Sequence, residues 1–252
     1  MLDCTVIIPL VKLDNDNLKK LAKTAYNSVP NKMNVILVGN DEALSSFDCQ
    51  GSNITRLINN GDQSYQNQVN LAVEKVKTKY FTVLEFDDEL SELWFDNAEK
   101  YSNVNTDELF GMFPLTELVD YATNTTIGYA NEAFLASSFS EKIGYFDMDS
   151  LTEYLGFNTS GAIFLTKEFI ELGKLKPSMK LTFWHEFLMR ALYKECVIRV
   201  IPKVGCFHTV NRPNCMTDIY SKTMDNTEID WWIDIAKKEF YFKNDRNKTY
   251  KE

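Results

Sequence analysis

The chain has 252 residues, of which 36 are acidic and 27 basic, so its formal net charge is −9. This acidity argues against non-specific nucleic-acid binding, which depends on Lys and Arg to displace counterions from phosphates. No apolar run approaches the ~20 residues needed to cross a bilayer, and the N-terminus lacks the pattern of a secretory signal. We therefore expect a cytoplasmic protein with reduced cysteines, no transmembrane segment and no nucleic-acid partner.

Strand-like and helix-like patterns alternate through the first hundred residues. Continuous β-branched apolar runs predict buried strands at 4–11, 34–38, 54–58 and 79–84. Helical spacing of apolar residues follows the first and third of these strands, which indicates βαβ units and a largely parallel sheet. Polar clusters follow three strands, at 39–42, 59–62 and 85–89. Because ligands of such sheets bind beyond the carboxyl ends of the strands, these clusters are expected to border one site.

The second half is less regular. From about 103 to 156 the mixed pattern predicts irregular covering structure with room for one hairpin. Strands are then predicted at 162–165 and 196–201, and helices at 167–173, 182–194 and within 225–252. Trp231 and Trp232 on the last helix fit docking against the core better than a sugar-binding role.

Glu85, Asp87, Asp88 and Glu89 form an acidic turn directly after a predicted buried strand. Four carboxylates within five residues repel one another and raise some of their pKa values unless a cation lies among them. Hard oxygen ligands suit Mg²⁺ or Mn²⁺, which can bridge the phosphates of a nucleotide. A solvated turn in which Asp88 or Ser91 caps the next helix remains the alternative.

Three stretches resemble family 2 glycosyltransferases with the GT-A fold. Thr5 to Pro9 resembles the family's opening strand and proline, and Asn60-Gly61 followed by Asn70-Leu71-Ala72 is similar to its Asn-x-Gly and Arg-Asn-x-Gly stretch. Tyr80 to Leu90 resembles its strand leading into an Asp-x-Asp-Asp turn. The resemblance implies an α/β fold of the GT-A (Rossmann-like) kind, with a mostly parallel central sheet flanked by helices and a C-terminal helix.

The resemblance also implies that the chain is a single domain whose successive parts have different roles. Residues 1–102 are expected to bind a nucleoside diphosphate sugar of the UDP or GDP type, and residues 103–215 the acceptor. Residues 216–252 are expected to form a helical tail.

The resemblance places specific side chains around the donor. It implies that Asp87 holds Mn²⁺ or Mg²⁺, with Asp88 beside it and His208 completing the metal site. The residues expected to contact the nucleotide are Pro9, Asn40, Asp41, Asn70, Glu85, Asp87 and Arg212. The chain departs from the family pattern at Glu85, where an Asp is usual, and at Val69, where an Arg is usual. As alternatives, His208 is a structural residue and Arg212 a member of a surface ion pair.

Glu186 is the candidate catalytic base. It lies near the start of a predicted helix that resembles the family's Glu-Asp helix start, and there it would take the proton of the acceptor hydroxyl. The alternative is an i,i+4 ion pair with Arg190, worth about 0.3 kcal/mol. A zinc-protease site is excluded, because Met189 follows His185-Glu186 where that motif needs a second histidine.

The leading hypothesis is metal-dependent, inverting sugar transfer to the hydroxyl of a glycan or another acceptor, the inversion being implied by the resemblance. A sugar nucleotidyltransferase would need a glycine-rich loop after the first strand, and the stretch from Leu10 to Asn15 has no glycine. The departures from the family pattern also leave open a GT-A-like domain that has lost catalysis and acts as a binding module.

Overall fold

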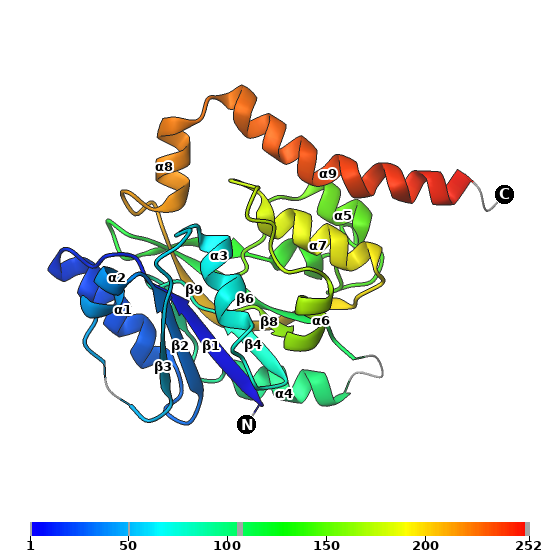
Figure 1. The fold of residues 1–252 in the computed structure, drawn as a ribbon. Helices are drawn as coiled ribbons and strands as arrows, with labels where there is room; N and C mark the ends of the chain where they lie inside the picture. Colours follow the sequence, from blue (N-terminus) through cyan, green and yellow to red (C-terminus); the bar gives the residue numbers. More distant parts are fainter. Residues whose placement is uncertain (1, 50, 105–107, 250–252) are drawn as a thin grey trace.

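The computed structural model describes residues 2–49, 51–104 and 108–249, and these form a nine-stranded sheet flanked by helices (Figure 1). The strand order is β3-β2-β1-β4-β8-β6-β9-β5, and β7 pairs with β6. The strands are β1 (Cys4–Pro9), β2 (Asn34–Gly39), β3 (Ile54–Ile58), β4 (Tyr80–Val83), β5 (Glu89–Leu90), β6 (Gly111–Asp120), β7 (Thr126–Ala130), β8 (Ile163–Leu165) and β9 (Ile198–Val210).

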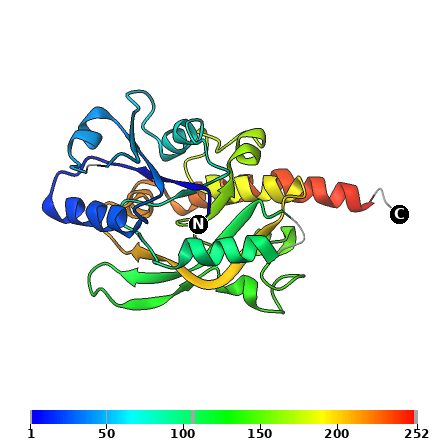
Figure 2. The same cartoon turned by 90° about the horizontal axis from the view of Figure 1, so that it is seen from below.

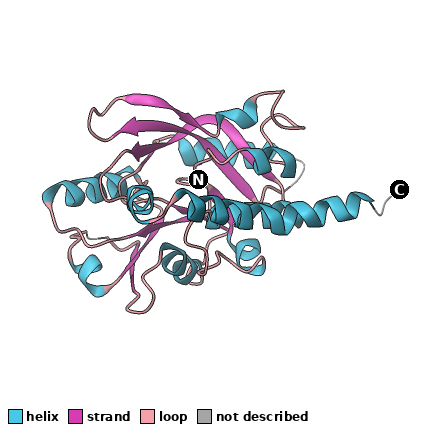
Figure 3. Cartoon of the chain, turned by 90° about the horizontal axis from the view of Figure 1, so that it is seen from above, coloured by secondary structure: helices cyan, strands magenta, loops and turns pink. Residues whose placement is uncertain are grey.

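Helices lie on both faces of the sheet (Figures 2 and 3). Helices α1 and α4 lie on one side of the central strands, and α3 and α6 on the other (Figure 2). The helices are α1 (Asp16–Ser28), α2 (Asp41–Ser45), α3 (Tyr65–Val73), α4 (Trp94–Val104), η1 (a 3-10 turn, Glu132–Leu135), α5 (Met148–Glu153), α6 (Thr166–Glu171), α7 (Phe183–Tyr193), α8 (Met216–Thr223) and α9 (Asn226–Thr249).

The first four strands confirm the predicted parallel sheet. Strand β1 is buried along its whole length, as its continuous apolar run predicts. It pairs in parallel with β2 and β4, with Thr5 opposite Asn34 and Cys4 opposite Tyr80. Their carboxyl ends therefore meet at one edge, where the polar turns follow.

The other half of the sheet is mixed, and it curls around α4 (Figure 2). Strand β8 pairs antiparallel with β4 and β6, whereas β6 and β9 are parallel. Trp94 of α4 is fully buried, and its Nε1 donates to the carbonyl of Gly161 at 2.8 Å. A Cβ at Gly205 would lie 2.4 Å from the Trp94 ring, so β9 can pass α4 only because this residue has no side chain.

The structure confirms one hairpin in the weakly patterned middle region, since β6 and β7 pair antiparallel. The predicted end of the strand at Ile201 is wrong, because β9 continues through Pro202 to Val210. Proline tolerates this place because the β6–β9 register shifts opposite it, between Pro114 and Thr116. The longer strand carries His208 to the carboxyl edge of the sheet.

The tail helix α9 packs against α7 and projects from the body of the molecule (Figure 1). Trp232 and Ala236 belong to the core, and the carbonyl of Trp232 accepts a hydrogen bond from Thr182 at 2.9 Å. Trp231 is 51% exposed. The predicted docking of the two tryptophans against the core is therefore confirmed for Trp232 and not for Trp231. Within the described ranges, no helix has the length and apolar character needed to cross a membrane.

Candidate functional site

Two adjoining cavities lie at the carboxyl edge of the parallel strands. Chamber 1, about 910 Å³, is lined by residues 9, 11–12, 14–18, 63, 65, 68, 85–87, 121, 212–216, 219 and 220. Chamber 2, about 520 Å³, is lined by residues 85, 87, 155, 157–159, 181–185, 208–211 and 215–217. Four residues line both chambers: Glu85, Asp87, Cys215 and Met216. The acidic turn therefore stands where the two chambers meet.

The acidic turn is positioned by the strand before it and by a buried ring. The amide of Leu84 donates to the Ile7 carbonyl at 2.9 Å, and the amide of Asp88 closes the turn on Glu85 at 3.1 Å. Phe86 is 6% exposed and lies under the Arg212 guanidinium, whose central carbon is 5.0 Å from the ring centroid. Burial of this ring fixes its two acidic neighbours at the cleft.

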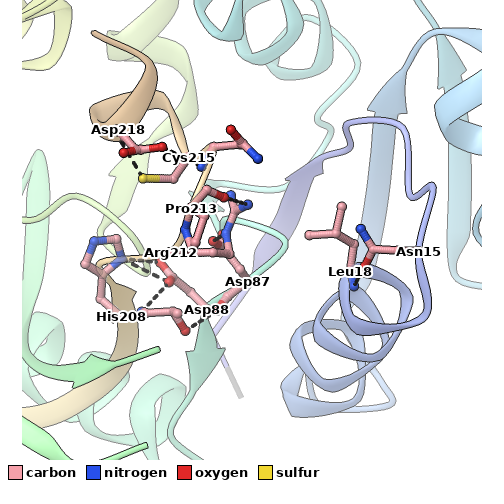
Figure 4. Close-up of polar contacts among 11 residues, drawn as sticks. Asn15, Leu18, Asp87, Asp88, His208, Arg212, Pro213, Cys215 and Asp218 are labelled. Carbon is pink, nitrogen blue, oxygen red and sulfur yellow. Dashed lines mark hydrogen bonds and ion pairs between the residues drawn. The ribbon is translucent and has the colours of Figure 1, made fainter. Parts of the chain in front are cut away.

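Asp88 and His208 form a buried ion pair (Figure 4). The ring Nδ1 of His208 lies 2.9 Å from each carboxylate oxygen, and the amide of Thr209 donates to Oδ1 of Asp88 at 3.0 Å. Burial opposes the charge on His208, but Asp88, with Glu85 and Asp87 behind it, outweighs that cost and raises the pKa of His208 to about 10. The ring is therefore protonated at neutral pH.

This pairing occupies Nδ1 of His208 and both oxygens of Asp88. A metal-binding histidine commonly donates one ring nitrogen to a carboxylate and offers the other nitrogen to the ion. The contact with Asp88 therefore fits a structural histidine and equally a metal ligand that binds through Nε2, and the expected metal role of His208 stays a prediction.

Arg212 and Asp87 form the second ion pair of the cleft (Figure 4). Nε of Arg212 donates to Oδ2 of Asp87 at 2.5 Å, and the arginine is only 8% exposed. Burial and the neighbouring Asp88 raise the pKa of Asp87, and Arg212 offsets part of that shift. Arg212 is thus not a surface residue, and it contributes a positive charge to the wall of chamber 1.

Glu85 differs from the other two acidic residues of the turn in having no ionic partner among the described residues. Burial, then Asp88 and Asp87, raise its pKa to about 8. In the part of the chain that the structure describes, its carboxylate makes no hydrogen bond or ion pair. Asp88 is balanced by His208 and Asp87 by Arg212, whereas Glu85, with its raised pKa, is mostly protonated at pH 7.

The carboxylate oxygens at the cleft supply only part of the ligands that a divalent cation needs. Glu85 and the Oδ1 atom of Asp87 are free of ion pairs and line both chambers. Across residues 2–49, 51–104 and 108–249, no three His, Cys, Asp or Glu side chains are arranged to hold a metal ion. Magnesium commonly takes one or two carboxylates and completes its shell with water and substrate phosphates. The fit therefore depends on phosphate oxygens from a bound ligand.

Of the other residues expected to contact the nucleotide, only some lie at the cleft. Pro9 lines chamber 1, but Asn40, Asp41 and Asn70 do not. Oδ1 of Asn40 caps α2 by accepting from the amide of Ala43 at 2.8 Å, and Asp41 is the first residue of that helix. The side chain of Asn70 donates to the carbonyl of Leu175 at 2.8 Å and accepts from its amide at 3.0 Å. Asn40 and Asn70 thus have structural partners, Asp41 is exposed at the start of α2, and none of the three lines chamber 1.

Glu186 is also withdrawn from the cleft. It is 1% exposed and lines neither chamber. Its oxygens accept from Nε and Nη2 of Arg190, at 3.0 and 2.8 Å, and Lys176 Nζ lies 2.8 Å from Oε1. Because no substrate can approach these oxygens, the geometry does not support the predicted role of Glu186 as the base. The i,i+4 pair with Arg190 is the observed arrangement.

Several lining residues were not identified from the sequence. Tyr65 and Gln68 of α3 enter chamber 1, together with Tyr121 and Tyr220 from the second half. Nε2 of Gln68 donates to the carbonyl of Gln63 at 3.0 Å, and among the described residues its buried Oε1 has no partner. On the opposite wall, Asn15 caps α1 by accepting from the amide of Leu18 at 3.0 Å (Figure 4). The signal in the sequence that could have identified Tyr65 and Gln68 is the presence of polar side chains on the partly apolar helix α3.

Comparison with known family patterns gives no match, and no curated protein matches the chain. Solved structures do match. Residues 1–349 of S. aureus TarS align with 82% of this chain at a TM-score of 0.59 and 14% identity. The same protein in complex with UDP-GlcNAc aligns with 86% at 0.60, and in complex with UDP with 93% at 0.62. The chain has a GT-A-like fold. It spans 60 to 65% of the length of these TarS chains.

Proposed function

We propose that this protein transfers a sugar from a nucleoside diphosphate sugar, first of all a UDP-sugar, to an acceptor hydroxyl. The observation that carries this proposal is the junction of two chambers at Glu85 and Asp87, beyond the carboxyl end of β4. The donor binds in chamber 1 and the acceptor in chamber 2. The TarS complexes with UDP and UDP-GlcNAc support this assignment of ligand class.

The charge of chamber 1 supports a divalent cation as part of donor binding. Its lining contains two basic residues, Lys12 and Arg212, and both are already paired with carboxylates. The acidic residues of the lining are Asp14, Asp16, Glu85 and Asp87. A diphosphate would be repelled by this wall unless a cation stood between them. Mn²⁺ or Mg²⁺ held by Asp87 and the diphosphate would neutralise charge on the leaving group, and Glu85 would stay free of the cation.

Two protein cations are placed to act on the same leaving group. Arg212 is fixed through Nε by Asp87, which leaves Nη2 able to donate to a phosphate oxygen. His208 is held charged by Asp88, and it lines chamber 2 beside the junction. Both charges are oriented before substrate binds, so no reorganisation is needed as negative charge develops on the diphosphate.

In the transfer step, an acceptor oxygen in chamber 2 attacks the anomeric carbon of the donor sugar at the junction. The new carbon–oxygen bond forms as the bond to the diphosphate breaks, and the electron pair leaves with the diphosphate in chamber 1. Glu85 and Asp87 are the acidic residues of the described lining of chamber 2, so one of their carboxylates accepts the hydroxyl proton. Attack from the side opposite the leaving group inverts the anomeric configuration.

A binding module without catalysis is the second candidate function. The withdrawal of Glu186 into ion pairs with Arg190 and Lys176 favours it, because the carboxylate expected to act as base is unavailable to substrate. Such a module would retain nucleotide binding in chamber 1.

A donor panel separates the two functions. The protein is incubated with UDP-GlcNAc, UDP-glucose or GDP-mannose, with Mn²⁺ and a mixture of glycoside acceptors, and released nucleotide is measured. Transfer predicts acceptor-dependent nucleotide release that falls by about 10²-fold or more in Asp87→Ala. Asp41→Ala is the matched control, because Asp41 follows β2, another strand of the same parallel sheet, and lines neither chamber. Nucleotide binding without release from any donor would favour the binding module.

A further inference from the structure

Arg212 holds Asp87 through a single hydrogen bond. Its Nε donates to Oδ2 of Asp87 at 2.5 Å, and its Nη1 donates to the carbonyl of Pro213 at 3.4 Å (Figure 4). Among the described residues, no acceptor is bonded to Nη2 of Arg212 and no donor to Oδ1 of Asp87. Both residues line chamber 1. The pair therefore keeps one donor and one acceptor for a ligand.

The surroundings hold this pair in place. The guanidinium lies over the buried ring of Phe86, and the two side chains of the pair are 10% and 6% exposed. Oγ1 of Thr209 donates to the backbone carbonyl of Asp87 at 2.6 Å, and the amide of Cys215 donates to the carbonyl of Arg212 at 3.3 Å. The guanidinium at Oδ2 is thus a fixed neighbour of any group that binds Oδ1.

This neighbour opposes a cation that arrives alone. A divalent ion at Oδ1 would share one carboxylate with the guanidinium, and two positive charges so close in a buried place repel each other. Asp88 adds no free negative charge, because it is paired with His208. Within residues 2–49, 51–104 and 108–249, no three His, Cys, Asp or Glu side chains form a metal-binding group. The protein by itself therefore attracts a cation weakly.

A diphosphate reverses this balance. Its oxygens supply the negative charge that the site lacks, and they can accept from the free Nη2 of Arg212. Mn²⁺ and Mg²⁺ commonly complete their shell with phosphate oxygens, so the cation is then attracted by the ligand as well as by Asp87. The same guanidinium that repels the cation attracts the ligand.

Building on the proposed donor site, we propose that Arg212 keeps a divalent cation off Asp87 until a nucleoside diphosphate is bound. The arginine stays paired with Asp87 throughout, and it lowers the affinity for the cation while it raises the affinity for the diphosphate. The protein without nucleotide accordingly binds Mn²⁺ weakly, and the cation enters the site together with the donor.

Manganese titrations without nucleotide test the first effect. Free Mn²⁺ is followed by electron paramagnetic resonance with wild type and with two neutral variants, Arg212→Gln and Arg212→Met. The titrations are run at pH 8, because Arg212 lowers the pKa of Asp87 and its loss lets burial raise that pKa further. Both variants are expected to bind Mn²⁺ at least about tenfold more tightly than wild type. Unchanged or weaker binding in the variants, or tight binding to nucleotide-free wild type, overturns the proposal.

Two further variants separate this effect from general electrostatics and from folding. Arg212→Lys keeps the charge and should resemble wild type. Lys12→Met removes the other basic residue of the described lining of chamber 1, whose Nζ pairs with Glu42 at 2.6 Å. It should change the Mn²⁺ affinity by less than about twofold, because exposed charges are screened by salt. An equal gain in Lys12→Met contradicts a specific effect at Asp87, and thermal unfolding is recorded for every variant.

UDP titrations at saturating Mn²⁺ test the second effect, which has the opposite sign. The affinity for UDP is expected to fall about fivefold or more in Arg212→Gln and Arg212→Met, because both lose a charged donor to the phosphate. Arg212→Lys should retain most of it. A purely structural arginine would weaken the binding of both ligands when replaced, so a joint loss of Mn²⁺ and UDP affinity overturns the proposal.

Failure of the proposed function gives a different result. It appears as absence of UDP binding to wild type, whether or not Mn²⁺ is present. The titration of Mn²⁺ without nucleotide does not depend on the donor site, and it decides in either case whether Arg212 keeps the cation off Asp87.

Discussion

His208 and Asp88, which are 120 residues apart in the chain, share a proton at the junction of the two chambers, with Nδ1 2.9 Å from each carboxylate oxygen. The contact joins the acidic turn after β4 to the end of β9 (Figure 4). It orients the His208 ring and balances the charge of Asp88.

This pair predicts a loss of stability at alkaline pH. The pKa of His208 is about 10 in the folded protein, against 6.5 for an unperturbed ring. Because the folded value is higher, the stabilisation is complete below about pH 6.5 and is lost as pH rises toward 10. At about 1.4 kcal/mol for each pKa unit, we expect the free energy of unfolding to fall by up to about 5 kcal/mol across this window, and by much less in His208→Asn. Urea unfolding at several pH values measures it, and identical pH slopes for wild type and variant would refute the assignment.

His185 predicts the opposite dependence at acid pH. Burial and then the nearby charge of Lys237 lower its pKa to about 4, against the bond to Leu151, which raises it. Because the folded pKa is below the unfolded value of 6.5, stability is complete above pH 6.5 and is lost as pH falls toward 4. The loss should be up to about 3 kcal/mol, and absent from His185→Gln. Parallel acid unfolding curves for the two proteins would show that this ring does not titrate as described.

Glu186 is predicted to act on stability and not on chemistry. Replacing it by Gln removes the buried carboxylate that pairs with Arg190, which should cost about 3 kcal/mol. The matched control is Glu171→Gln, which breaks the exposed pair with Lys167 and should change stability by less than about 1 kcal/mol. Thermal unfolding tests both. A stable Glu186→Gln protein that has lost only sugar transfer would restore its role as the base.

Gly205 is predicted to be intolerant of any side chain. A Cβ there would lie 2.4 Å from the buried ring of Trp94 and 2.8 Å from Cβ of Pro114. Gly205→Ala should lower the free energy of unfolding by about 3 kcal/mol. Gly128→Ala is the control, since a Cβ at that strand position meets no atom within 4 Å. Equal unfolding midpoints for the two variants would contradict this account of how β9 passes α4.

The sequence predicted the elements whose signals are local. The apolar run at Cys4–Pro9 and the polar turn after Tyr80–Val83 identify buried strands and the edge where a site should lie, because both depend on neighbouring residues alone. Asp87 and Arg212 were each identified as site residues. Their ion pair was not, because it joins positions 125 residues apart.

The errors concern partners that come from distant parts of the chain. Helical periodicity shows that Glu186 and Arg190 can meet, but not that Lys176 and the loop before α7 bury them. Proline at 202 normally ends a central strand, and only the register shift against β6 shows why β9 continues. Chamber 2 was missed for the same reason, since its wall combines four separated segments, within 85–87, 155–159, 181–185 and 208–217.

Metal-dependent nucleotide binding tests the central claim most directly. UDP is titrated calorimetrically into wild type, Asp87→Ala and the control Asp41→Ala, each with and without Mn²⁺. The account predicts that UDP binds wild type and Asp41→Ala at least about tenfold more tightly with Mn²⁺, and that this gain disappears in Asp87→Ala. UDP binding that is equal in all three proteins, or independent of Mn²⁺, would contradict a donor site built on Glu85 and Asp87.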